Sequence, residues 1–211
     1  MATTATKLSI FNGALRVLKE TPLTQNEVTN NTREPARLLN AVWTDGGVDD
    51  CLEAGQWRFA KRAVMLDYTP SVEPDLDYGG YQHAFEKPDD FVRICGMWTD
   101  GWQGQPLTDY REENGYWLAD LETIWITYVS NDAAYGLDYS LWPQSFRKFV
   151  HAHFASEIAG PLTSQGKETL QLRKMLLREA LAIDGMADPT KFLPVGSWVR
   201  ARGGSVSREN R

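Results

Sequence analysis

The hydrophobic residues in the first quarter of the chain follow a helical period. A first helix is expected over residues 3–20, because four apolar side chains recur there every three or four residues: Leu8, Phe11, Leu15 and Leu18. A polar loop is expected after it. A second helix is expected from Thr32, with residues of one face at four-residue steps: Leu39, Trp43, Gly47 and Cys51. Gly46 and Gly47 each cost about 1 kcal/mol relative to alanine in a helix interior. Either the helix breaks there or another backbone packs closely against it, and we favour one continuous helix.

The hydrophobic period changes near Gly55, within residues 51–69. It falls from about 3.6 to about 2 residues, which is typical of a helix that leads into a strand. Trp57 and Phe59 lie at this junction, and each can bury on the order of 150–250 Å². We therefore expect them to hold the helical part of the protein against its β part. The basic residues between and after them are expected to face water or a partner: Arg58, Lys61 and Arg62.

The middle of the chain has the patterns of a small antiparallel sheet. Alternating, β-branched and aromatic residues predict strands over residues 62–69, 91–98 and 123–129. Residues 110–119 predict a hairpin, with Asn114-Gly115 at its turn. Asn-Gly between apolar alternations is the strongest short hairpin signal, since both positions accept positive φ.

Helical spacing returns in residues 142–160 and 163–184, and the chain becomes irregular after Asp188-Pro189. The whole pattern predicts an α+β protein: a bundle of about four helices, an inserted small antiparallel β-sheet and an extended C-terminal arm. We expect N-terminal helices in residues 1–60, the β insertion in 61–139, C-terminal helices in 140–188 and an extended or flexible arm in 189–211.

Composition is that of a folded, water-exposed protein. The 211 residues are 42% hydrophobic and 24% charged, enough for one domain of ordinary size or one with an insertion. The eight tryptophans favour a well-filled core and a large interface. No apolar run approaches the ~20 residues that span a bilayer, and no signal peptide is expected. Cys51 and Cys95 stand alone, so we expect a reducing compartment and no disulfide.

Charge is distributed unevenly. The formal net charge is −6. The last sixteen residues hold four arginines against Glu209, a balance of +3, which leaves −9 for the rest. An acidic body does not favour nucleic-acid binding, which needs Lys and Arg facing phosphates, but it suits a surface that DNA passes without sticking. The alternative is a nucleic-acid-binding module that uses this basic tail.

Groups with catalytic chemistry are sparse. His151 and His153 lie roughly 200° apart around a helix, so they cannot share a metal ion. Two carboxylate pairs leave a hydrolase acting on polysaccharide as the less favoured alternative: Asp89-Asp90 and Glu112-Glu113. The second pair would point to opposite faces of a flat strand. We expect no catalytic, metal or cofactor site, and hence no enzyme.

Three stretches together resemble one family. They are residues 55–62 (GQWRFAKR), 80–94 (GYQHAFEKPDDFVRI) and 146–163 (FRKFVHAHFASEIAGPLT). In the second stretch the likeness lies in Tyr81, Ala84-Phe85, Pro88, Asp90 and Val92-Arg93. The order and spacing resemble the tail tubular protein A family of short-tailed bacteriophages, the head-to-tail adaptors, over roughly residues 5–190. Gly46-Gly47 and the arginine-rich end depart from that pattern.

The resemblance implies a structural virion protein. Members form a dodecameric ring between the portal protein and the tail nozzle, which is built by tail tubular protein B. Genomic DNA passes through the lumen during ejection and is not bound specifically. The implied location is the head-to-tail interface of the virion, after assembly in the host cytoplasm. Interface candidates in this chain are Trp57, Arg58, Phe59, Arg62, Tyr81, Phe85, Arg93, Arg200 and Arg202.

Overall fold

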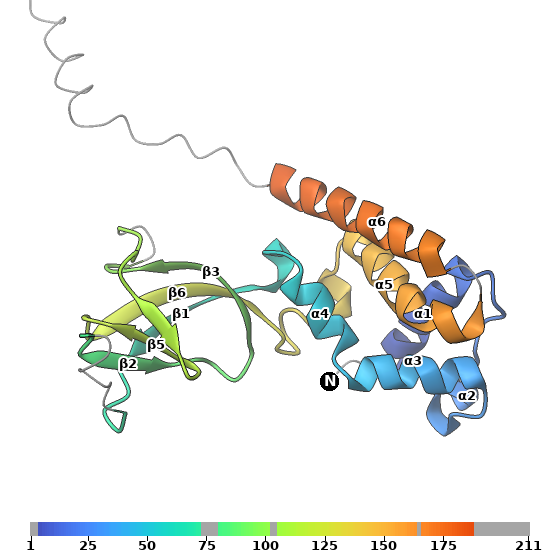
Figure 1. Ribbon diagram of the computed structural model, residues 1–211, viewed down its shortest axis with the longest axis horizontal. Helices are drawn as coiled ribbons and strands as arrows, with labels where there is room; N and C mark the ends of the chain where they lie inside the picture. Colours follow the sequence, from blue (N-terminus) through green and yellow to red (C-terminus); the bar gives the residue numbers. More distant parts are fainter. Residues whose placement is uncertain (1–3, 73–79, 102–104, 164–165, 188–211) are drawn as a thin grey trace, which may run out of the picture.

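The computed structural model describes residues 4–72, 80–101, 105–163 and 166–187, which form a helical lobe and a β lobe at opposite ends of the molecule (Figure 1). The helices are α1 (Thr4–Val17), α2 (Gln25–Asn30), α3 (Glu34–Thr44), α4 (Gly47–Glu53), α5 (Gln144–Leu162) and α6 (Gly166–Met186). The strands are β1 (Lys61–Asp67), β2 (His83–Glu86), β3 (Phe91–Trp98), β4 (Arg111–Glu113), β5 (Tyr116–Ala119) and β6 (Thr123–Ser130). The predicted α+β class is confirmed.

Two three-stranded antiparallel sheets make the β lobe. Their strand orders are β1-β6-β3 and β2-β5-β4. Side chains of both sheets form one buried cluster that includes Phe85, Met97, Trp117, Ile126 and Tyr128. The two sheets therefore pack face to face around a small core of their own.

The predicted hairpin is confirmed. β4 and β5 pair around Asn114 and Gly115, whose φ angles are 47° and 85°. These left-handed values are those that an Asn-Gly hairpin turn requires. The strands predicted over residues 91–98 and 123–129 also appear, as β3 and β6.

A larger core lies among the helices. α1 contributes Phe11 and Leu15, and α5 contributes Phe149 and Phe154, all fully or almost fully buried. α5 contacts α1, α3, α4 and α6, so it is the central helix of the lobe (Figure 1). Trp57 is 1% exposed in this core and precedes a short 3-10 helix, Arg58–Ala60, that leads into β1. Its indole Nε1 donates a hydrogen bond of 2.9 Å to the Cys51 carbonyl oxygen.

The prediction of one continuous second helix is wrong. α3 ends at Thr44 and α4 begins at Gly47. Gly46 between them has φ 89°, a left-handed conformation that interrupts a right-handed helix and that glycine adopts without steric cost. Gly47 is buried, and its backbone lies close to Val42 and Phe154. Both readings of the glycine pair therefore hold: the chain breaks at the first glycine and packs closely at the second.

A short helix, α2, occupies the region predicted to be a loop. Thr24 caps it: the hydroxyl accepts from the Glu27 backbone N–H, and the Glu27 carboxylate accepts from the Thr24 backbone N–H. Val28 on α2 is buried in the helical core. The capping-box spacing in the sequence was the signal for this helix.

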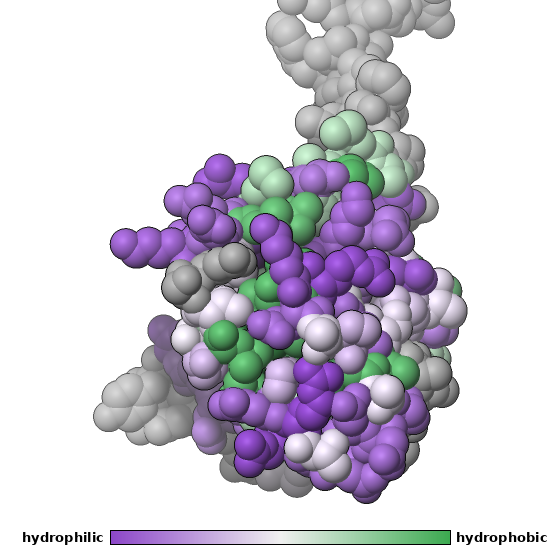
Figure 2. All heavy atoms as spheres, turned by 90° about the vertical axis from the view of Figure 1, so that its right-hand side faces the viewer, coloured by the Kyte–Doolittle hydropathy of each residue, from purple (hydrophilic) through white to green (hydrophobic). Residues whose placement is uncertain are grey.

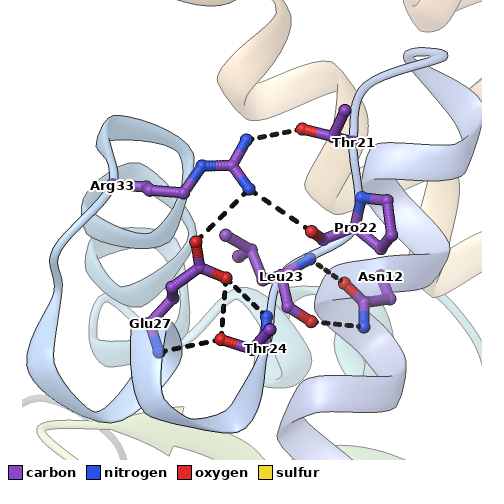
Figure 3. Close-up of polar contacts among 7 residues, drawn as sticks. All are labelled: Asn12, Thr21, Pro22, Leu23, Thr24, Glu27 and Arg33. Carbon is purple, nitrogen blue, oxygen red and sulfur yellow. Dashed lines mark hydrogen bonds and ion pairs between the residues drawn. The ribbon is translucent and has the colours of Figure 1, made fainter.

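Polar contacts fix the turn between α1 and α3 (Figure 3). The Asn12 side chain exchanges two hydrogen bonds with the Leu23 backbone, at 2.7 and 3.0 Å. Arg33 reaches Glu27 in an ion pair of 3.6 Å and donates to the Pro22 carbonyl oxygen and the Thr21 hydroxyl. This network holds α2 between the two longer helices.

Two other boundaries differ from expectation. The four residues of β2 fall outside every predicted strand. α5 continues to Leu162 with Pro161 in its last turn, whereas the sequence predicted an end before Pro161. The arm in residues 189–211 lies outside the described residues.

The lobes join through the residues on either side of the β insertion. Ala60 and Val129 are buried in the helical core. Arg93 on β3 donates a hydrogen bond of 2.8 Å from Nη1 to the Glu53 carbonyl oxygen at the end of α4. Lys61 at the start of β1 pairs with Val129 near the end of β6, so the chain enters and leaves the β lobe at neighbouring points.

Candidate subunit interface

Helix α6 carries most of the large hydrophobic side chains that face solvent. Of the eight such side chains in the described residues, five lie on this helix: Leu170, Met175, Leu181, Ile183 and Met186. Their exposed fractions run from 37% for Leu181 to 79% for Met186. Isolated exposed apolar residues are ordinary, but a concentration on one element marks a contact surface.

The helical period explains how α6 can be both anchored and exposed. Thr169 and Ala180 are buried against the bundle, and their separation of eleven positions amounts to about three full turns. Leu170 and Leu181 follow these two residues directly, so they form one margin of the buried face. Met175 and Met186 are also eleven positions apart, and they lie about 120–140° from Ala180 on the other side of the helix, towards solvent. We call these four side chains together the α6 margins.

The helix lies along the outside of the bundle, packed on α5 (Figure 1). Figure 2 shows the helical end of the molecule, where most of the surface is hydrophilic; hydrophobic side chains appear near the top, at the height of α6 in Figure 1, and in further groups lower on the face.

An apolar cavity of about 250 Å³ lies beside the last turns of α6. It is lined by Trp57, Arg58, Phe59, Pro143, Ser145, Phe146, Ala180, Ile183, Asp184 and Ala187. We call it the Trp57 pocket. The Arg58 backbone N–H donates to both oxygens of the Asp184 carboxylate, at 3.3 and 3.4 Å, and ties the end of α6 to the segment before β1.

Two of the predicted interface residues belong to the interior of the subunit. Trp57 is 1% and Phe85 0% exposed. Trp57 packs edge-on to Phe146 with ring centroids 4.7 Å apart. Their side chains therefore stabilise the two cores and offer no surface to a second copy.

The remaining described candidates are at least partly exposed. Arg58 and Phe59 line the Trp57 pocket. Tyr81 donates its hydroxyl to Asp109 at 2.8 Å, and this hydrogen bond raises the pKa of Tyr81. Arg93 is exposed and bonded to α4 as described above. Arg200 and Arg202 lie outside the described residues.

Arg62, the last candidate, is part of a polar network under the first sheet. Its Nη1 lies 2.8 Å from Oδ2 of Asp90, which also accepts from the Ser130 hydroxyl, while Oδ1 accepts from the Tyr128 hydroxyl at 2.9 Å. Burial alone would raise the pKa of Asp90, but these three hydrogen bonds outweigh it and lower that pKa. Burial, with the bond to Asp90, raises the pKa of Tyr128. Asp90 is therefore held as a carboxylate that ties β1, β3 and β6 together.

The two candidate glutamates also have structural partners. Glu112 forms an ion pair with Lys87, and Glu113 lies 3.2 Å from Arg111. An open groove of about 570 Å³ runs beside β1 and is lined in part by Asp89 and Asp90. Neither glutamate lines this groove. The geometry thus joins Asp90 to a hydrogen-bond network, and Glu112 is engaged by Lys87 at the groove.

In the part of the chain that the structure describes, no group of three or more His, Cys, Asp or Glu side chains could hold a metal ion. His151 and His153 project from α5 into the protein instead. Burial lowers the pKa of His151 to about 4, helped by the nearby Arg16 and Arg147, and burial also lowers the pKa of His153. Both rings are therefore neutral near pH 7.

Sequence reasoning placed Leu170, Leu177 and Leu181 on one side of the last helix but did not identify an exposed surface there. The missed residues are Met175 and Met186. The available signal was the width of the apolar distribution: α6 has more apolar positions than one buried face can hold.

No protein-family model matches the chain, and no curated protein matches it. Among the described residues, no helix is both long enough and apolar enough to cross a bilayer. The chain is thus defined by its fold, an α+β protein of two lobes, and by the exposed apolar surface of α6.

Proposed function

We propose that this protein is a structural subunit of a phage virion: a head-to-tail adaptor whose copies form a ring, a dodecamer by the family resemblance, between the portal protein and the tail nozzle. Genomic DNA would pass through the lumen without specific binding. The observation that supports this proposal best is the exposure of the α6 margins. Ring formation requires each copy to present a contact surface to its neighbour, and the exposed apolar side chains of α6 support a contact there.

The chemistry of these margins suits contact between subunits. Methionine and leucine are apolar and adaptable, and methionine is enriched at protein interfaces. A ring closes through heterologous contacts, in which the margins of one copy meet a different surface of the next. Stable interfaces bury roughly 800 Å² on each partner, so the α6 margins would form the centre of a larger contact.

The polar residues support a role without catalysis. The best-placed acidic residue, Asp90, has both carboxylate oxygens engaged in holding the first sheet together. The net charge of −6 suits a conduit that DNA crosses, because an acidic surface does not attract phosphates.

Assembly with portal rings tests the proposal directly. The purified chain, alone and mixed with portal rings from the same source, would be examined by light scattering and negative-stain microscopy. We expect rings, or a further tier on the portal. A chain that stays monomeric and does not bind the portal would refute the adaptor role.

A double variant tests the surface. Met175→Glu with Met186→Glu places two charges on the α6 margins, and we expect it to raise the dissociation constant between copies at least tenfold, which corresponds to about 1.4 kcal/mol. The measurement is sedimentation velocity over a range of concentrations, or occupancy on portal rings. The melting temperature should stay close to that of the parent, since both side chains are exposed.

Met65→Glu is the matched control. Met65 is 55% exposed and Met175 is 56% exposed, but Met65 lies on β1 in the other lobe. We expect it to leave association between copies unchanged. Equal association by the double variant and the parent would place the subunit contact away from α6.

A further inference from the structure

The Trp57 pocket is a small cavity with a mainly apolar lining. Its volume of about 250 Å³ lies below the roughly 300–1,000 Å³ of small-molecule sites. Its floor is aromatic, formed by Trp57, Phe59 and Phe146, and the polar side chains are few: Arg58, Ser145 and Asp184. Such a cavity suits one or two apolar side chains better than a polar ligand.

Ile183 shows that this pocket lacks a cover among the described residues. It lies within about 60° of Ala180 on the α6 wheel, on the side that faces the bundle. Ala180 is 0% exposed, whereas Ile183 is 45% exposed. The bundle covers Ala180 and leaves Ile183 exposed, so apolar surface on the inner side of α6 remains in contact with water. Covering it would release that water.

The chain itself continues from the rim of the pocket. Ala187, the last described residue, is one of the lining residues. Asp188-Pro189 follows, and proline disfavours the helical conformation of the residue before it. Asp-Pro also favours the start of a turn. The sequence therefore ends α6 at the pocket and favours a change of direction there.

The residues that follow Pro189 supply apolar side chains of the kind that the pocket suits. After Thr190 and Lys191 comes the apolar run Phe192-Leu193-Pro194-Val195, which is the first after the pocket; Trp198 and Val199 follow further along, and residues 203–211 hold a single apolar side chain. Five residue steps separate Ala187 from Phe192, a reach of at most about 18 Å. That reach easily covers a pocket that Ala187 itself lines.

We propose that the Trp57 pocket is the docking site for Phe192 and Leu193 of the same chain. The arm would turn at Asp188-Pro189 and place these two side chains against Phe59 and Ile183, above the buried rings of Trp57 and Phe146. Lys191 would then lie near the carboxylate of Asp184. The docked run anchors the root of the arm, and the arginines at 200 and 202 extend from a fixed point. This proposal does not rest on ring formation.

Cysteine crosslinking tests the occupant. In a Cys95→Ser background, Ser145→Cys places a thiol on the pocket and Leu193→Cys places one on the docking run. Cys51 can stay, because it is fully buried and burial raises the pKa of its thiol well above the usual value. Ser145→Cys with Ser205→Cys is the matched control, since its second thiol lies on the same arm beyond the run.

Copper–phenanthroline oxidation of dilute full-length protein is followed by non-reducing electrophoresis and peptide mass spectrometry. We expect the 145–193 pair to form a disulfide within one chain at least ten times faster than the 145–205 pair. Equal rates for the two pairs would refute docking. A disulfide between two chains would also overturn the proposal, and would assign the pocket to the arm of a neighbouring copy.

Hydrogen exchange provides a measurement without engineered thiols. Phe192→Asp should increase the exchange of backbone amides in residues 57–60 and 180–187 at least threefold, because a charged side chain cannot fill the pocket. Phe192→Leu should restore most of the protection, and Val206→Asp, further along the arm, should change nothing. Identical exchange in Phe192→Asp and the parent would refute docking.

Discussion

At the scale of single residues, Trp57 shows how one side chain stabilises the boundary between two kinds of structure. It follows the end of α4 and precedes β1, and its ring contacts Phe59, Phe146 and Phe149. The hydrogen bond from its indole to Cys51 satisfies the only polar atom of the side chain.

Trp57→Ala should therefore destabilise the fold strongly. Removing a fully buried aromatic ring costs on the order of 3–5 kcal/mol through lost burial and the cavity that remains. In a chain of this size that corresponds to a decrease in melting temperature of roughly 6–20 °C, measurable by calorimetry. Trp57→Phe keeps most of the apolar volume and should lose clearly less. An unchanged melting temperature in Trp57→Ala would contradict the burial of this ring.

His151, which is partly buried, and His153, which is buried, make stability depend on pH. The His151 ring has a folded-state pKa of about 4, below the ordinary value of 6.5, so the unfolded chain binds more protons between these values. His151 therefore stabilises the fold fully above pH 6.5, and this contribution is lost as the pH falls towards 4. Burial lowers the pKa of His153 as well, which acts in the same direction.

Denaturant unfolding between pH 7.5 and 4.5 measures this effect. We expect the free energy of unfolding to decrease on acidification, by on the order of 3 kcal/mol from His151. His151→Gln has no proton to gain and should show a flatter profile across the same range. The groups facing His151 include Arg16 and Arg147, which stay charged throughout and favour the neutral ring. A profile in the variant as steep as that of the parent would assign the acid sensitivity elsewhere.

At the scale of elements, Gly46 determines that the second helical segment is two helices. Its φ of 89° reverses the local handedness and lets α4 leave the axis of α3. α4 then brings Cys51 and Leu52 into the core and leads to Trp57. The corner is thus needed for the junction with the β lobe.

Gly46→Ala should destabilise the protein by about 1–2 kcal/mol, because a side chain at this φ is strained. The cost is strain alone, since an added Cβ would meet no atom closer than 3.7 Å. Gly185→Ala is the matched control. Gly185 lies near the end of α6 with open space around it, so this substitution should be neutral or slightly stabilising. Equal melting temperatures for the two variants would argue against a left-handed Gly46.

The sequence predicted best the elements whose patterns are long or whose turn chemistry is specific. α1, α5, β3 and the Asn-Gly hairpin fall within a few residues of their predicted bounds. α2 and β2 were missed, because six and four residues are too short to establish a period. The sequence alone did not decide whether the helix breaks at Gly46-Gly47, because a glycine pair is compatible with a continuous helix and with a left-handed corner.

At the scale of the whole molecule, the candidate site depends on information that the sequence lacks. Apolar residues on α6 were visible, but which of them face solvent is decided by how the helix rests on α5. Trp57 and Phe85 illustrate the converse. Aromatic residues in a family-like motif suggested an interface, and packing between elements distant in sequence placed both in cores. Arg62 likewise finds its partner, Asp90, 28 residues further along the chain.

The pairing of Lys61 with Val129 has a consequence for how this protein can change. Paired residues in an antiparallel ladder lie only about 4.5–5.5 Å apart. The β lobe is therefore inserted into the helical lobe through two chain connections that lie side by side. Loops within it can lengthen while α1 to α6 keep their mutual geometry. Sequence changes in the loops of the β lobe can therefore adapt it to a new binding partner while the helical lobe keeps its structure.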